Sequence, residues 1–89
     1  MLALSQTTKL KRDIKLMQKR NADMRAFKLV VESLMSEIPL PEKFRDHALS
    51  GNWQGFRECH ITPDWLLIYK IDAKVLILHR TGTHSDLFR

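Results

Sequence analysis

The fold is decided by residues 65–81, which read WLLIYKIDAKVLILHRT. Residues 65–71 are almost entirely apolar, as is typical of a strand buried on both faces. Residues 75–81 form a second apolar run, and Asp72-Ala73 between the two runs fits the tight turn of a hairpin. The sequence therefore predicts two antiparallel strands at the centre of a sheet.

A third strand is predicted over residues 53–61, and a break at residues 62–63 separates it from the buried strand. Its two-residue alternation places Glu58 and His60 on one face and Cys59 on the other. Cys59 is the only cysteine of the chain, so no internal disulfide is expected. We interpret Cys59 as a buried structural residue rather than a nucleophile, since cysteine is often buried and inert.

The first half of the chain predicts two amphipathic helices, separated by a turn at residues 21–23. Pro39 and Pro41 should end the second helix, because proline cannot continue it, and residues 2–4 suit a short edge strand. The elements predict an α+β fold over residues 1–89, in which a helical hairpin packs on one face of a small twisted antiparallel sheet and leaves the other face free. The apolar stripes are Leu10, Ile14 and Met17 in the first helix, and Met24, Phe27, Val31, Leu34 and Ile38 in the second.

Positive charge is concentrated in residues 7–28, which carry eight basic residues against two acidic ones, whereas the whole chain has a net charge of +5. Such a one-sided field attracts nucleic acid or an acidic protein segment, although a solvated helix face is the simpler interpretation. Lys15 and Lys19 are the candidate RNA contacts here. The chain has no basic leader and no apolar run near the roughly 20 residues that cross a bilayer, so a cytoplasmic location without membrane contact is expected.

All four histidines lie in the second half of the chain. His47, His60 and His84 fall where the chain turns, and Asp64 follows shortly after the second of them. His79 alternates with core positions, and we interpret it as structural. Histidine exchanges protons near neutral pH, and RNA supplies its own nucleophile in the 2′-hydroxyl group. A histidine pair with a carboxylate therefore suits a ribonuclease that removes the 2′-hydroxyl proton and protonates the leaving 5′-oxygen.

Three further side chains suit contacts with RNA. Arg80 has the planar fork that binds a phosphate, and Trp65 and Phe88 have rings that stack on unpaired bases. Trp65 in the sheet core and Arg80 in a surface salt bridge are the structural alternatives. A metal site built from the turn histidines and Asp64 matches no familiar zinc spacing, so no metal or cofactor is expected.

Three blocks of sequence resemble one known family. They are residues 43–53, KFRDHALSGNW, residues 56–70, FRECHITPDWLLIYK, and residues 80–88, RTGTHSDLF. In order and spacing they are similar to the motifs of YafQ-type toxins, a branch of the RelE/ParE superfamily. The resemblance implies a RelE-like microbial ribonuclease fold and a type II toxin that cleaves mRNA in the A site of the 70S ribosome without a metal. It also implies a DinJ- or RelB-like antitoxin that covers the basic surface, and binding of operator DNA only through the antitoxin complex.

The resemblance also implies roles within the site. His84 corresponds to the general acid, while His47 and His60 share the base and phosphate-orienting roles in an order that the sequence leaves open. RelE itself relies on lysines and arginines, so only the YafQ-like branch transfers these roles. The implied catalytic residues are His47, His60, Asp64 and His84, and the implied supporting residues are Trp65, Arg80, Phe88, Lys15 and Lys19.

Two other function classes fit parts of the sequence. The ParE-like branch of the same superfamily inhibits DNA gyrase, and it has no need of three turn histidines and an aspartate. A plain nucleic-acid-binding module needs only the basic helices, and it would bind with strong salt dependence but form no covalent product.

Overall fold

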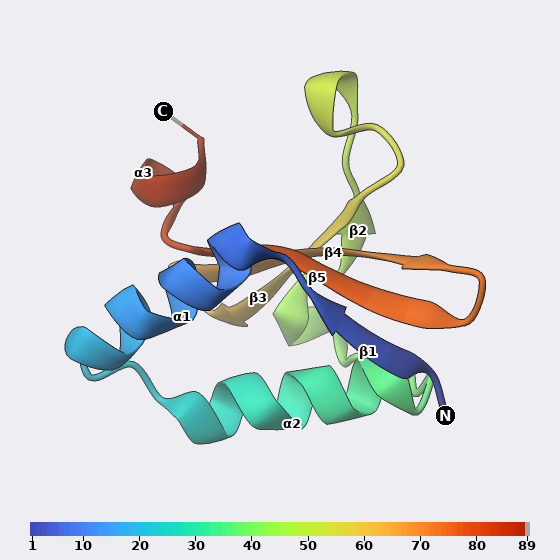
Figure 1. Ribbon diagram of the computed structural model, residues 1–89, viewed down its shortest axis with the longest axis horizontal. Helices are drawn as coiled ribbons and strands as arrows, with labels where there is room; N and C mark the ends of the chain where they lie inside the picture. Colours follow the sequence, from blue (N-terminus) through green and yellow to red (C-terminus); the bar gives the residue numbers. More distant parts are fainter. Residues whose placement is uncertain (89) are drawn as a thin grey trace.

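The computed structural model describes residues 1–88, and Arg89 lies outside the described residues. Five strands form one sheet in the order β1-β5-β4-β3-β2, with helices packed against it (Figure 1), so the predicted α+β class is confirmed. None of the described helices is both long and apolar enough to cross a membrane. The elements are β1 (Ala3–Gln6), α1 (Thr8–Lys19), α2 (Met24–Met35), β2 (His47–Ala48), β3 (Arg57–Thr62), β4 (Trp65–Asp72), β5 (Val75–Gly82) and α3 (His84–Leu87), with short 3₁₀ helices at Glu42–Phe44 and Gly51–Trp53.

The hairpin of β4 and β5 forms the centre of the sheet, as predicted. Leu66, Leu67 and Ile68 of β4 have no exposed surface, which explains the unbroken apolar run. The turn lies one residue later than expected. Ala73 and Lys74 have φ values of 49° and 63°, and two successive left-handed residues are the signature of a type I′ hairpin turn.

The sheet is mixed rather than wholly antiparallel, which corrects one part of the prediction. β1 runs parallel to β5, with Ala3 opposite Val75 and Gln6 opposite Leu78. A parallel neighbour requires a long connection, and nearly the whole chain lies between these two strands. The short edge segment near the N-terminus indicated a strand but carried no signal for its direction.

The two faces of the sheet differ in what covers them. On one face, Trp65, Leu67 and Tyr69 of β4 pack with Phe27 of α2 in the main core. Figure 1 shows α2 on one side of the sheet, and α3 together with the loop before β3 on the other. The second face is therefore partly covered rather than free.

Capping interactions set the limits of both long helices. Thr7 and Asp23 cap α1 and α2, and Asp23 belongs to the turn at residues 21–23 that was predicted to separate the helices. α2 ends at Met35, before the prolines that were expected to end it. The amide of Glu37 donates to the Leu34 carbonyl at 3.1 Å, and the next amide donates to the Ser33 carbonyl at 3.0 Å, which together form a Schellman motif. Ile38 consequently lies beyond the helix and is 58% exposed rather than part of the core.

Glu37 holds a left-handed φ of 56° at the end of α2, a conformation that favours glycine. We expect Glu37→Gly to raise the free energy of unfolding by roughly 0.5–1 kcal/mol, because it removes the Cβ strain. Glu32→Gly in the same helix is the matched control and should lower it by about 1 kcal/mol. Urea unfolding measures both, and a loss of stability in both variants would contradict this account.

Candidate active site

A buried glutamate joins two of the predicted histidines. His47 on β2 lies directly opposite Glu58 on β3, and His60 lies two residues further along β3 on the same face. One carboxylate oxygen, Oε2 of Glu58, is 3.2 Å from Nε2 of His47 and 3.8 Å from Nε2 of His60. The glutamate is 6% exposed, so the two rings enclose an almost fully buried acid.

His84 and Asp64 complete the cluster from the other side. His84 is the first residue of α3, and its Nδ1 is 3.4 Å from Oδ1 of Asp64 in the turn between β3 and β4. The rings of His84 and His60 are 5.7 Å apart between centroids. The structure thus brings all four predicted catalytic residues, drawn from four separate segments, into one row.

α3 is held in place by Arg20, the residue that caps the end of α1. Arg20, just after α1, donates to both carboxylate oxygens of Asp86, at 2.7 and 3.3 Å. Asp86 also forms a capping box with Thr83, which starts α3. The hydrogen bond from Arg20, followed by that from the Thr83 amide, lowers the pKa of Asp86 to about 2. The sequence pattern did not single out Arg20, since its partner is 66 residues away.

The segment that leads into β2 and His47 is held by a second carboxylate, that of Asp46. Asp46 accepts hydrogen bonds from the Tyr69 hydroxyl at 2.6 Å and from Nε of Arg57 at 3.2 Å. Nδ1 of His47 faces the Arg45 carbonyl at 2.6 Å. The neighbours of His47 therefore fix both its backbone and its ring.

An aromatic cluster borders the histidines. Phe88 is 38% exposed, and its ring lies 6.5 Å from that of His84 and 6.1 Å from that of Trp53. Phe88 is thus placed where an unpaired base can stack on it. His79 packs against Phe56 at 4.7 Å, and burial lowers its pKa, which agrees with its interpretation as a structural residue.

Trp65 does not border the site, which corrects its prediction as a stacking residue. It is 3% exposed and stacks on Phe27 of α2 at 5.7 Å. Its Nε1 donates to Oγ1 of Thr81 at 2.8 Å. The position of Trp65 on β4 turns its ring toward the helix side of the sheet, so it supports the site only through the core.

Arg80, predicted to bind a phosphate, is paired with a carboxylate instead. Arg80 donates to Asp13 of α1 at 2.7 and 3.2 Å, and this hydrogen bonding raises the pKa of its guanidinium group. Its planar fork is therefore occupied by a carboxylate rather than open to a phosphate, as in the salt-bridge alternative. Lys15 and Lys19 lie exposed on α1, and the described contacts of the histidine cluster do not include them.

The profile of one family, described as "Bacterial toxin of type II toxin-antitoxin system, YafQ", matches residues 2–89. The chain belongs to the YafQ family of type II toxins. A curated relative, the "mRNA interferase toxin YafQ" of Escherichia coli K12, is 47% identical over 78 residues, which are 86% of this chain and 85% of the relative.

Solved structures of relatives share the fold. YafQ in the E. coli DinJ-YafQ complex is 40% identical and superposes with a TM-score of 0.92 over 100% of both chains. A metal-bound toxin from Helicobacter pylori is 41% identical, with a TM-score of 0.93 over 99% of this chain and 100% of the relative. Within residues 1–88 of this YafQ-family chain, no three His, Cys, Asp or Glu side chains are grouped to hold a metal ion.

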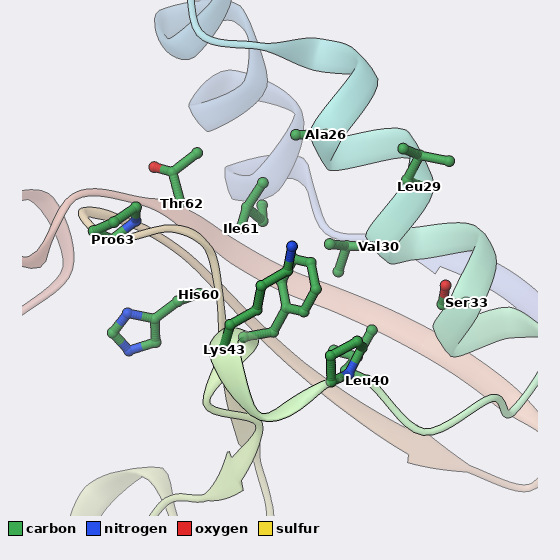
Figure 2. A pocket seen from close by; sticks show the side chains of 12 residues that line it. Ala26, Leu29, Val30, Ser33, Leu40, Lys43, His60, Ile61, Thr62 and Pro63 are labelled. Atoms are coloured by element: carbon green, nitrogen blue, oxygen red, sulfur yellow. The ribbon is translucent and has the colours of Figure 1, made fainter.

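A cavity of about 610 Å³ adjoins the site between α2 and β3. Figure 2 shows the His60 ring at its edge, on the side away from α2, with Lys43 in front of the cavity. Its lining is mainly apolar and includes Leu29, Val30 and Ile61. His60 thus borders this hollow, whereas His47, Asp64 and His84 are not among its lining residues.

Cys59, the remaining group with nucleophilic chemistry, faces the core. It has no exposed surface, and burial raises the pKa of its thiol to about 12. A thiol held in its neutral form is a poor nucleophile, so the prediction that Cys59 is structural is confirmed.

The pKa of Asp86 provides a direct test of how α3 is held. This pKa lies below the ordinary value of 3.8, so the stabilisation of α3 by the Arg20 contact is fully present above pH 3.8. That stabilisation is lost as the pH falls toward about 2 and Asp86 takes up a proton. We expect carboxyl NMR to give a pKa of about 2 in the parent and a value closer to 3.8 in Arg20→Ala. Lys19→Ala, the control on α1, should leave it unchanged. An Asp86 that titrates normally in the parent would contradict this assignment.

Proposed function

We propose that this YafQ-family toxin is an endoribonuclease that cleaves mRNA in the A site of the 70S ribosome by metal-independent acid–base catalysis. The observation that supports this best is the row of three histidines and one aspartate on a single face of the sheet. The E. coli relative's name, mRNA interferase toxin, supports the substrate class.

The chemistry uses the nucleophile that RNA carries. His47 or His60 removes the proton of the 2′-hydroxyl, and the 2′-oxygen attacks the adjacent phosphorus. The bond from phosphorus to the 5′-oxygen breaks, and His84 protonates that oxygen as it leaves. The products end in a 2′,3′-cyclic phosphate and a 5′-hydroxyl, so atoms and charge balance without a metal.

The surroundings of His84 suit the role of general acid. Its Nδ1 faces the Asp64 carboxylate at 3.4 Å, which orients the ring and leaves Nε2 for the leaving oxygen. Its side chain is 54% exposed, so an RNA strand can reach it. Phe88 beside it offers a surface for a neighbouring base.

The partners follow from the family and the substrate. A DinJ-like antitoxin would cover the basic surface of α1 and prevent contact with RNA, in keeping with the E. coli complex of DinJ and YafQ. Binding of operator DNA would then run through the antitoxin. Lys15 and Lys19 supply attraction to ribosomal RNA, and a ribosomal substrate places the toxin in the cytoplasm.

His84→Ala is the sharpest test of the acid. We expect a folded protein whose cleavage rate falls roughly 100- to 10,000-fold, the usual contribution of a general acid. Primer extension on a defined mRNA in a translating extract measures this as the loss of new in-frame 5′ ends. Ser85→Ala, the exposed neighbour on α3, should cleave like the parent. If the parent produces no new ends and translation continues, the proposed function is wrong.

Acid–base catalysis also predicts a pH profile and independence of transition metals. The single-turnover cleavage rate should rise and then fall with pH, because one histidine acts without its proton and another with it. The rate should persist with a chelator selective for transition metals, with Mg²⁺ kept to preserve the ribosomes. A loss of cleavage in the chelator that returns on adding a metal would support a metal mechanism instead.

A further inference from the structure

Glu58 is the least exposed acidic side chain near the site, and catalysis as described above does not use it. At 6% exposure it has lost nearly all contact with water, which is costly for a carboxylate unless partners compensate. Among residues 1–88, its ion-pair partners are the rings of His47 and His60. Its ion-pair partners are therefore the two groups that are candidates for the role of general base.

We propose that Glu58 is the positioning residue of the base side of the site, resting on the proposed ribonuclease function. Its carboxylate orients His47 and His60 together through one oxygen. It also balances the single positive charge that the pair gains when one ring takes the 2′-hydroxyl proton.

The strand geometry supports this role. The register of β2 on β3 places His47 directly opposite Glu58, and the alternation along β3 places His60 beside it. Both rings are thus fixed by the backbone to face the same carboxylate oxygen. Directly paired side chains of neighbouring strands are among the closest contacts in a sheet, so little movement is needed to hold them.

The ring contacts show what the carboxylate does to each histidine. A carboxylate accepts hydrogen bonds only, so Nε2 of His47, 3.2 Å away, is placed to carry a proton. Nε2 of His60, at 3.8 Å, lies beyond hydrogen-bond distance, but the negative charge still favours a proton on this nearer nitrogen. His47 also faces the Arg45 carbonyl through Nδ1, at 2.6 Å, so acceptors lie at both of its nitrogens. In this arrangement Nδ1 of His60 is free to accept the proton of the 2′-hydroxyl group. His47, with an acceptor at each nitrogen, is suited to act as a cation beside the phosphate.

The proposed general acid, His84, and the two candidate bases, His47 and His60, thus face different carboxylates. Asp64 faces His84, and its side chain is 75% exposed, whereas that of Glu58 is 8% exposed. Charges attract more strongly where water is excluded, so the base side is held more rigidly than the acid side. A change at Glu58 should therefore affect the base pair and leave His84 in place.

Glu58→Gln tests the proposal, since it keeps the shape and hydrogen-bonding capacity but removes the charge. We expect the single-turnover rate on ribosome-bound mRNA to fall roughly 10- to 100-fold, as for other partners that orient a reactive group, with half-saturating ribosome concentration unchanged. Imidazole ¹⁵N spectra should show altered Nε2 signals for His47 and His60 and unaltered signals for His84. Glu42→Gln, an exposed control in the 3₁₀ helix Glu42–Phe44, should resemble the parent in all three readouts.

The proposal would be overturned by a rate equal to that of the parent, or by a rate reduced only in proportion to the fraction of folded protein. A change confined to ribosome affinity would also overturn it. If Glu58→Gln does not fold, the imidazole ¹⁵N spectrum of the parent protein tests the proposal instead. An Nε2 without a proton in the ring of His47 or His60 would contradict the contacts with Glu58. If the parent protein leaves mRNA intact, the proposed function is wrong. The ¹⁵N spectra would still test whether Glu58 orients the two histidines.

Discussion

The two-residue alternation along β3 holds the core and the site in a fixed relation. Cys59 and Ile61 enter the helix-side core, whereas Glu58 and His60 meet the other histidines on the opposite face. A slip of one residue would exchange these faces and bury His60 in the core. The pairing of β3 with the fully buried strand β4 therefore sets the position of the whole cluster.

The irregular segments of the site are tied to this frame by carboxylates that bind distant partners. Asp46, next to His47, is held by Arg57 and Tyr69 of the sheet. Asp86, two residues after His84, is held by Arg20 at the end of α1. The same type of contact thus positions the histidines that do not lie on a long strand. Each pair restricts a segment too short to hold its own shape, since a four-residue helix or a two-residue strand is unstable alone.

The basic segment and the histidine cluster belong to different parts of the molecule. Five of the eight basic residues of the segment 7–28 lie on α1, whereas the three clustered histidines lie on β2, β3 and α3. Arg80 links the two regions through Asp13, a contact that fixes α1 against β5. Under the proposed function, attraction of a polyanion by α1 and cleavage by the histidines would be separable properties, and an antitoxin that covered α1 would not need to touch the histidines to block them.

The sequence by itself determined the α+β class, the central hairpin and the start of the second helix, because these depend on local periodicity, turns and caps. It also pointed to the three turn histidines and Asp64, which the structure brings together. It left open the parallel direction of β1 and placed the end of α2 at the prolines. Only the tertiary structure shows that Trp65 lies in the core, that Arg80 pairs with Asp13 and that Glu58 lies between two histidines. These features depend on which face each strand presents and on contacts between residues far apart in the chain, and neither is visible in a local pattern.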